Sequence, residues 1–322
     1  MRININQILF LANRIFTYFL SPVLLTHHFT LSRIYAEFQQ NHAGIRHRYG
    51  RRTQSGRCAF LQPSTKPGAR ALLCSPKPPP NLPAYIEHRV IAKLGYTEYS
   101  LFILFALWHV IETDFALIIQ DDGWVLDAAN WRDEFFNYDY IGAPTCHGRV
   151  DTATGTQWLA SFEWWDHLNK PGSSVYPILN GGFSLRSKRM LRVFIDHPQL
   201  EIKIPRPNSL AFNPLRMRWR SYAPNEDAQL SAILRPQLEK LGIKYAPIDL
   251  CCHFSAEDTG PYYNEMDFQN LFGHHASWRR LISIDPPTVQ YRLTRNIVQQ
   301  ARRERDIVRM FEDRGYIVQF PE

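Results

Sequence analysis

The sequence predicts an α/β protein with a mixed, mainly parallel sheet flanked by helices. Residues 115–120 (FALIIQ) form a short, continuously apolar run of the kind that fully buried parallel strands show. Helical and strand-like stretches alternate on both sides of this run, which is the order typical of α/β folds. The chain has 322 residues, of which 45% are apolar and 21% charged, so it is long enough to bury a substantial core.

The first half of the expected order begins with an apolar helix. Its elements are a helix over 100–113 with Ser100 as N-cap, a strand over 115–120, an acidic turn over 121–123, a helix over 128–136 capped by Asp127, and a strand over 138–144 that stops at Pro144. Ser and Asp are preferred N-caps because their side-chain oxygens accept hydrogen bonds from free backbone N–H groups. Residues 145–178 lack periodicity and predict a long loop.

The second half begins at a glycine pair. Its expected elements are a short strand after 180–182, a helix over 188–197 capped by Ser187, a helix over 228–234 opened by 225–227, strands over 244–247 and 250–254, a polar loop up to 272–275, and an amphipathic helix over 289–312. We therefore expect one domain over 85–287, followed by a C-terminal amphipathic helix and tail over 288–322.

The net charge of +7 belongs to the N-terminal quarter. Residues 1–80 hold eleven Lys and Arg against one acid, Glu37, so they carry +10 and the remaining residues carry −3. No nucleic-acid partner is expected for the acidic body. Residues 1–84 predict a basic, Pro-rich, poorly ordered region, and its segment 3–25 is apolar enough to associate with a membrane. A weak membrane-surface association through residues 1–80 is one expectation, and a solvated tail is the alternative.

Cysteine usage favours a reducing compartment. The five cysteines are an odd number without C-x-x-C spacing, which predicts neither a disulfide framework nor a zinc cluster. The expected location is the cytoplasm, with the periphery of the inner membrane as the alternative.

Two adjacent carboxylates, Asp121 and Asp122, follow the apolar run and precede a glycine. In open α/β sheets, ligands gather beyond the carboxyl ends of the strands. Adjacent acids repel one another there, and a divalent cation is the simplest compensating charge. This pattern predicts a site for Mn²⁺ or Mg²⁺, which could hold a diphosphate. The alternative is an ordinary β-turn with solvated acids.

A second acidic pair, Glu226 and Asp227, opens a predicted helix. One of these acids could be the general base that takes a proton from a hydroxyl acceptor. Helix capping is the plainer interpretation, because the helix dipole favours carboxylates at this end. Of the pair His274 and His275, one imidazole is a plausible further metal ligand or a merely structural side chain.

The expected loop over 145–178 contains two adjacent tryptophans. Trp164 and Trp165 could stack on a sugar face, but tryptophans are as often part of a core or a subunit contact. Asn180, Gly181 and Gly182 permit a close backbone approach before a strand.

Five motifs carry a resemblance when taken in order. They are FALIIQDDGWVLDAANWRDEFFNYDYIGAP, NGGFSLRS, NEDAQL, HFSAE and FGHH. Over residues 96–280 they resemble a bacterial domain family of unknown function that is similar to GT-A glycosyltransferases. The resemblance implies a GT-A-like (Rossmann-like) fold and a hexosyltransferase-type enzyme using a nucleotide-sugar donor and a glycan or other hydroxyl acceptor.

The resemblance also assigns roles to residues. It implies that Asp122 is the preferred metal ligand and Asp121 the second candidate, and that His275 matches the family's histidine better than His274 does. The substrate-binding residues that it implies are Asn180, Gly181, Gly182 and Phe183, and its catalytic acids are Asp227, as candidate base, and Glu226.

One departure from the resemblance concerns the nucleotide-binding half of the fold. GT-A folds use an N-terminal strand and turn for the nucleotide, and residues 40–84 show no buried strand before a glycine turn. The alternative function is therefore an inactive nucleotide- or carbohydrate-binding relative with an incomplete donor site.

Overall fold

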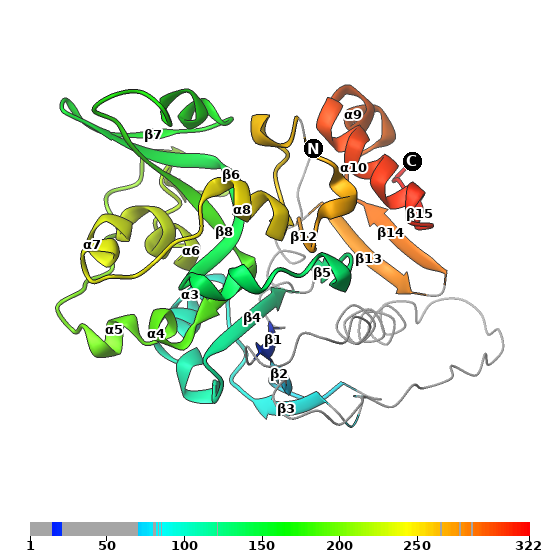
Figure 1. Cartoon of the computed structure of the whole chain (residues 1–322), viewed down its shortest axis with the longest axis horizontal. Helices are drawn as coiled ribbons and strands as arrows, with labels where there is room; N and C mark the ends of the chain where they lie inside the picture. The colour runs from blue at the N-terminus through cyan, green and yellow to red at the C-terminus, as the bar shows by residue number, and fades with distance from the viewer. Residues whose placement is uncertain are drawn as a thin grey trace.

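The computed structural model describes residues 15–20, 70–79, 82, 84, 86–120, 122–264, 266–276, 278–284 and 286–322. A seven-stranded sheet runs through its centre in the order β3-β2-β1-β4-β8-β6-β7 (Figure 1). Its strands are β1 (Ile15–Leu20), β2 (Arg70–Ser75), β3 (Ile86–Val90), β4 (Phe115–Gln120), β6 (Tyr140–Thr152), β7 (Gly155–Leu159) and β8 (Ser174–Ser187).

The prediction of a mainly parallel, GT-A-like sheet is wrong. Only β2 and β3 pair in parallel, whereas the other five pairings of this sheet are antiparallel. The strand β4 was correctly located, and its Ala116 and Ile118 face one hydrophobic cluster while Leu117 and Ile119 face another. Burial on both faces produces a continuous apolar run whatever the direction of the neighbouring strands, so the run could not report that direction.

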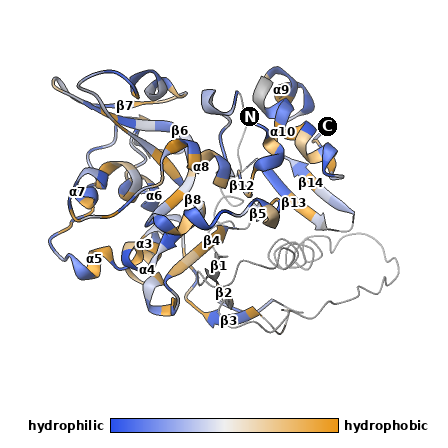
Figure 2. Cartoon of the chain, in the orientation of Figure 1, coloured by the Kyte–Doolittle hydropathy of each residue, from blue (hydrophilic) through white to orange (hydrophobic). Residues whose placement is uncertain are grey.

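Helices cover one face of β4. The helix α3 (Tyr96–Phe105) packs there with α4 (Lys188–Leu191) and the 3₁₀ turn η2 (Leu107–Val110). Figure 2 shows β4 as a predominantly hydrophobic strand at the centre of the molecule. The predicted start at Ser100 is wrong, because Gly95 is the N-cap and its N–H donates to Glu98 Oε2 at 2.6 Å.

The expected loop over 145–178 is mostly strand. β6 continues past Pro144, turns into β7, and β8 begins at Ser174, with the 3₁₀ turn η5 (Glu163–His167) between β7 and β8. Pro144 is tolerated because the register between β6 and β8 shifts on both sides of it, as at a β-bulge. The two glycines of N-G-G lie inside β8 rather than before a short strand.

Two predicted caps are confirmed. Asp127 accepts a hydrogen bond from the backbone N–H of Ala129, and Ser187 accepts one from that of Met190. The helix expected over 128–136 is instead two 3₁₀ turns, and the one over 188–197 is α4 and α5 in succession. These elements are η3 (Ala128–Asn130), η4 (Asp133–Asn137) and α5 (Val193–Asp196).

The strand expected over 250–254 is wrong. These residues belong to the helix α8 (Ile248–Phe254), and residues 244–247 hold only an isolated bridge between Tyr245 and Tyr140. The acidic opening at 225–227 does begin a short helix. It is α6 (Glu226–Ala228), continued by the π-helical turn η6 (Gln229–Ile233) and α7 (Arg235–Lys240).

Three smaller sheets complete the fold. One contains β5 (Gly123–Val125), β11 (Ser255–Ala256) and β12 (Gly273–His275), and another is the hairpin of β9 (Ser209–Ala211) and β10 (Arg216–Arg218). The third contains β13 (Arg279–Ile284), β14 (Pro287–Tyr291) and β15 (Ile317–Gln319). With α9 (Arg295–Gln300) and α10 (Arg302–Asp313), it lies at one side of the molecule, next to β5 and β12 (Figure 1). The 3₁₀ turns η7 (Pro261–Tyr263) and η8 (Phe268–Asn270) precede β12. The single helix expected over 289–312 is thus the end of β14 followed by α9 and α10.

The N-terminal quarter contributes strands to the main sheet. β1 lies within the segment 3–25 that we expected at a membrane, and it pairs with β2 and β4. β2 and β3 then extend the sheet, although no buried strand was expected in residues 40–84. The rest of the expectation for residues 1–84 lies outside the described residues. Within the part of the chain that the structure describes, no helix has both the length and the apolar character needed to cross a membrane.

Candidate functional site

A histidine meets a carboxylate just beyond the end of β4. Gln120 ends this strand, Asp122 follows before β5, and β5 pairs with β12 so that His275 stands opposite Gly123. This pairing places His275 Nε2 at 2.9 Å from Asp122 Oδ1 and at 3.2 Å from Gln120 Oε1. Asp122 and His275 are therefore brought together, as the metal prediction requires, whereas Asp121 lies outside the described residues.

The other ring nitrogen of His275 also has polar neighbours. Its Nδ1 lies 3.1 Å from Asn180 Nδ2 and 3.5 Å from Glu257 Oε1. His274, the adjacent residue of β12, points to the other side and packs its ring against Trp124 at 4.2 Å between centroids. His274 is fully buried in this aromatic environment, and burial holds its pKa well below the ordinary value.

The cluster of Asp122, Glu257 and His275 is electrostatically coupled. Burial alone would lower the pKa of His275, but the carboxylates of Asp122 and Glu257 raise it to about 10. Burial would raise the pKa of Asp122, but His275 and Arg280 bring it below its ordinary value. Burial raises the pKa of Glu257, against the opposing effect of His275. The charge that the acids need is thus supplied in part by an imidazolium.

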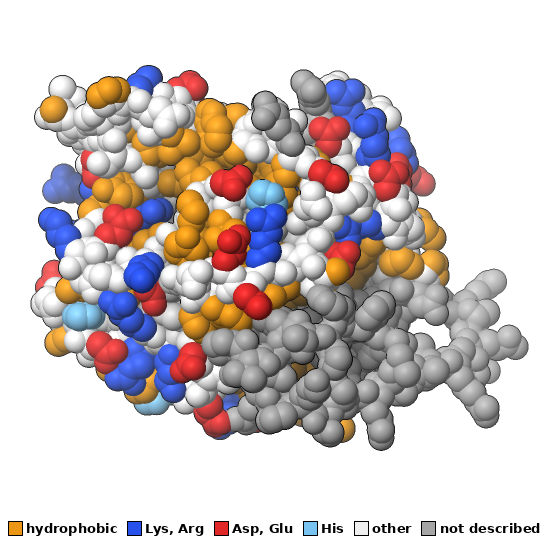
Figure 3. Space-filling view, in the orientation of Figure 1, with side chains coloured by type: hydrophobic (Ala, Val, Ile, Leu, Met, Phe, Trp, Pro, Cys, Tyr) orange, Lys and Arg blue, Asp and Glu red, His pale blue; other side chains and the backbone are white. Residues whose placement is uncertain are grey.

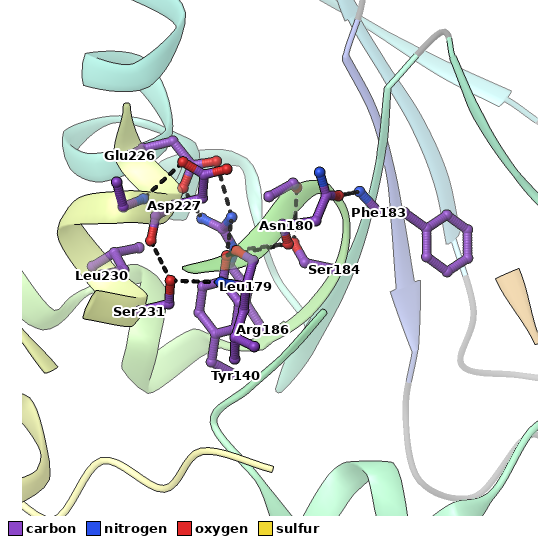
Figure 4. A network of polar contacts seen from close by, with 12 residues as sticks. Tyr140, Leu179, Asn180, Phe183, Ser184, Arg186, Glu226, Asp227, Leu230 and Ser231 are labelled. Atoms are coloured by element: carbon purple, nitrogen blue, oxygen red, sulfur yellow. Dashed lines mark hydrogen bonds and ion pairs between the residues drawn. The ribbon is translucent and has the colours of Figure 1, made fainter. Parts of the chain in front are cut away.

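A second polar cluster lies between β6, β8 and α6 (Figure 4). Arg186 of β8 is fully buried and forms a bidentate ion pair with Glu226, with distances of 2.7 Å and 3.0 Å. The same guanidinium donates to Tyr140 Oη at 3.1 Å and to Ser184 Oγ at 3.1 Å. Glu226 is therefore held by a buried partner, which suits a positioning residue better than a proton acceptor.

Asp227 lies beside this ion pair but is not part of it. Its Oδ1 accepts a hydrogen bond from the backbone N–H of Ala228 at 2.7 Å, and the side chain keeps partial exposure. Burial first, and then the charges of Glu226 and Glu257, raise the pKa of Asp227 to about 7. Asp227 therefore has a pKa suited to proton transfer near neutral pH.

The two predicted glycines separate the two clusters. A Cβ on Gly181 would collide with Glu226 and Arg186, whereas a Cβ on Gly182 would collide with His275 and Gln120. Each glycine therefore permits a close approach of β8 to one cluster. Glu257 electrostatically connects the clusters, because it contacts His275 and also raises the pKa of Asp227.

The remaining predicted substrate-binding residues occupy different environments. Asn180 is buried, and its Oδ1 accepts a hydrogen bond from the Phe183 N–H at 2.8 Å. Phe183 points away from the polar network (Figure 4) and is fully buried against Phe254. Trp164 is also fully buried, whereas Trp165 is partly exposed. Both tryptophans pack against Tyr262 rather than against residues of the two clusters.

The Asp122 cluster offers few ligand atoms for a metal ion. No three His, Cys, Asp or Glu side chains in the described ranges are arranged to hold a metal. Asp122 Oδ1 is a buried oxygen that lies 2.9 Å from His275 Nε2, and the raised pKa of His275 keeps a proton on that ring, so a metal ion would have to replace this proton. Mg²⁺ is commonly bound by one or two carboxylates together with substrate phosphates, and Asp122 is the carboxylate that this cluster would offer to such an ion.

A cavity of about 590 Å³ lies away from these clusters. Its lining is Arg149, Thr156, Trp158, Ile202, Lys203, Ile204, Pro205, Ser221, Ile233, Pro236 and Gln237. None of the described predicted site residues lines it. On the face drawn in Figure 3, acidic and basic side chains are interspersed over the described surface rather than segregated by sign.

Three residues of the site were not singled out in the sequence. Gln120, Arg186 and Glu257 make the contacts described above, and each lies inside one of the motifs FALIIQ, NGGFSLRS and HFSAE. A polar residue at the end of a buried strand, or a charged one inside an apolar strand, was the signal that could have identified them.

The described residues define a mixed α/β protein whose candidate site combines carboxylates, a histidine and a glycine-lined strand. The chain belongs to the DUF5672 family of proteins of unknown function, whose profile matches residues 89–275, more than half of the chain. This confirms the prediction of a domain family of unknown function. The match starts in β3 and ends at His275, so both clusters lie within it. Comparisons with curated proteins and with solved structures gave no match.

Proposed function

We propose that the chain is a glycosyltransferase that moves a sugar from a nucleoside diphosphate donor to a hydroxyl acceptor. The observation that carries the proposal is Asp227, a partly exposed carboxyl whose pKa is raised to about 7 by burial and by the charges of Glu226 and Glu257. Glu257 also contacts His275, and so connects Asp227 electrostatically to the Asp122 cluster. A general base works best when its pKa lies near the operating pH. The choice of a sugar donor rests on the resemblance of the ordered motifs to a domain family that is in turn similar to glycosyltransferases.

In the proposed reaction the acceptor hydroxyl attacks the anomeric carbon of the donor. The new carbon–oxygen bond forms as the bond to the diphosphate breaks, and the diphosphate leaves with the electron pair. Asp227 takes the acceptor proton, which corresponds to an inverting transfer. Glu226 keeps its ion pair with Arg186 throughout and thereby fixes the start of α6, which carries Asp227.

The proposal includes Mn²⁺ or Mg²⁺ at Asp122, with Gln120 and His275 beside it. A divalent cation bound there would supply Lewis-acid neutralisation of the departing diphosphate. Asp122 would orient the donor phosphates through it, and the carboxylate of Glu257 faces the other nitrogen of the His275 ring at 3.5 Å. Because the protein offers few ligand atoms for a metal ion, we expect metal and nucleotide to bind together rather than separately.

The proposed location is the cytoplasm. Among the described residues the cysteines Cys74, Cys146, Cys251 and Cys252 are free thiols, as is usual in a reducing compartment.

The test is calorimetric titration of the full chain with nucleoside diphosphate sugars, with and without Mn²⁺. We expect donor binding that needs metal, loss of this metal-dependent binding in Asp122→Asn, and loss of transfer but not of donor binding in Asp227→Asn. The matched control is Asp249→Asn, because the Asp249 side chain is 89% exposed and contacts neither cluster. If no donor gives metal-dependent heat, the proposal is wrong.

The alternative function is a non-catalytic nucleotide- or carbohydrate-binding protein. The observation that favours it is the ion pair between His275 and Asp122, which balances the carboxylate within the protein itself. This alternative requires donor binding without Mn²⁺ and no release of sugar, both unaffected by Asp227→Asn. The same titrations, followed by assays of donor hydrolysis and transfer, distinguish the two functions.

A further inference from the structure

The hairpin of β9 and β10 has two unlike faces. It pairs with no other described strand. Leu210 stands opposite Met217 across the hairpin, and Arg216 and Arg218 flank Met217 along β10. Because side chains alternate along a strand, Leu210 and Met217 share one face, and the two arginines share the other.

The apolar face and the tip of the hairpin are exposed. The exposed fractions are 50% for Leu210, 61% for Met217, 72% for Phe212 and 66% for Leu215. Single exposed apolar side chains are common on soluble proteins, but four within eight residues form a contiguous patch. Such patches mark interaction sites.

The surroundings of this patch are strongly basic. Residues 202–225 contain five cations and no acid, although residues 81–322 carry a net charge of −3. The cations are Lys203, Arg206, Arg216, Arg218 and Arg220, and all five are exposed. None of them is in an ion pair with a carboxylate of the described residues.

The base of the hairpin is fixed to the rest of the segment. Trp219 Nε1 donates to the Pro205 carbonyl at 2.8 Å, and the Asn208 N–H donates to the Arg218 carbonyl at 2.8 Å. The Arg220 N–H donates to Asn208 Oδ1, also at 2.8 Å. The exposed tip is therefore presented on an ordered support and does not need to fold on contact.

From these observations we propose that the hairpin docks on an anionic phospholipid bilayer. Phe212, Leu215 and Met217 enter the boundary between headgroups and acyl chains, and Arg216 and Arg218 pair with lipid phosphates. Apolar side chains beside unpaired cations are the combination that binds anionic membrane surfaces. A second copy of the chain fits less well, because a ten-residue hairpin falls far short of the ~800 Å² per partner that a stable interface buries.

The test is flotation of the full chain with vesicles of phosphatidylglycerol and phosphatidylcholine, compared with vesicles of phosphatidylcholine alone. Each cation near an anionic surface changes the partition coefficient by ~5-fold, so Arg216→Ser with Arg218→Ser should lower it by ~25-fold. We expect Phe212→Ser with Leu215→Ser to lower it by at least ~10-fold on the same vesicles.

Matched controls keep the number and type of changes. The pair Arg305→Ser and Arg309→Ser removes two exposed arginines of α10, and Val90→Ser with Ile297→Ser removes two exposed apolar side chains. Both control pairs should partition like the unaltered chain. All variants keep residues 1–80, so any binding by that region is the same in each.

Three outcomes would overturn the proposal. The first is equal partition of the hairpin variants and the unaltered chain, and the second is equal binding to vesicles with and without phosphatidylglycerol. The third is a change of oligomeric state in the Phe212 and Leu215 variant, measured by light scattering, with unchanged vesicle binding. This last result would assign the hairpin to a contact between copies of the chain.

Discussion

Replacing Asp227 by Asn should stabilise the protein at alkaline pH. The pKa of Asp227 is raised from 3.8 to about 7, mainly by burial and then by Glu226 and Glu257. A folded state that raises the pKa of an acid disfavours its ionised form. The contribution of protonated Asp227 to the free energy of unfolding is fully present below about pH 4 and is lost as the pH rises through about 7. Asn is a neutral substitute that loses nothing over this range.

The size of the effect follows from the pKa difference. A change of about 3 units corresponds to about 4 kcal/mol, because each unit is worth about 1.36 kcal/mol. Asp227 keeps partial exposure, so solvent screening reduces the expected gain to about 2 kcal/mol. The free energy of unfolding of Asp227→Asn should exceed that of the unaltered chain by this amount at about pH 8, and the difference should vanish at about pH 4.

Urea unfolding of both proteins over this pH range, followed by tryptophan fluorescence, measures the difference. Asp196→Asn is the control with the opposite sign, because a hydrogen bond from Arg192 lowers the pKa of Asp196. That variant should lose stability at neutral pH and recover it in acid. A stability difference for Asp227→Asn that does not change with pH would refute the assignment of a raised pKa, and with it the candidate base.

Two further predictions concern the packing around β8. Glu226→Gln leaves Arg186 buried without a counter-charge, so the free energy of unfolding should fall by about 3–5 kcal/mol. Adding Arg186→Met to this variant should recover part of the loss. A loss below about 0.5 kcal/mol in urea unfolding would contradict this prediction. Gly182→Ala places a methyl group against His275 and should lower the free energy of unfolding by about 1–3 kcal/mol. The control is Gly95→Ala, whose methyl group would meet only a flexible Glu side chain at 3.3 Å. It should lower the free energy of unfolding by less than about 1 kcal/mol. Thermal unfolding checks this pair, and equal losses would mean that β8 can move away from His275.

Local signals in the sequence predicted the structure correctly where one or two residues determine it. Asp127 and Ser187 are caps as predicted, since capping depends on a side chain and the backbone two or three residues later. The apolar run of β4 was also recognisable. Its neighbours in the sheet were not, because pairing direction depends on how β8 and β1 return from distant parts of the chain.

Short apolar runs without periodicity remained ambiguous. Residues 250–254 resemble a buried strand but belong to α8. A run of five residues with four apolar side chains fits either a buried strand or about one and a half turns of helix. The segment 3–25 was interpreted as membrane-associating for a similar reason. Its residues 15–20 form β1, which pairs with β2 and β4, and an apolar run in the sequence is typical of strands as well as of membrane-associating segments.

The site shows what the order of motifs can and cannot encode. Asp122 and His275 were proposed together from the resemblance, but their contact is created by the pairing of β5 with β12, which no local pattern specifies. Glu257 was overlooked because its position depends on β11, which pairs with β12. Residues that act together here are joined by strand pairing rather than by sequence spacing.

The N-G-G motif gains a specific meaning from this geometry. Gly181 and Gly182 are consecutive residues of one strand, and consecutive positions of a strand face opposite sides. One side carries the ion pair of Glu226, and the other carries His275, so a side chain at either glycine would push one cluster away from β8. Since the charge of Glu257 acts on both His275 and Asp227, the two clusters form one electrostatic unit. A change on either side of β8 should therefore alter the proton affinity of groups on the other.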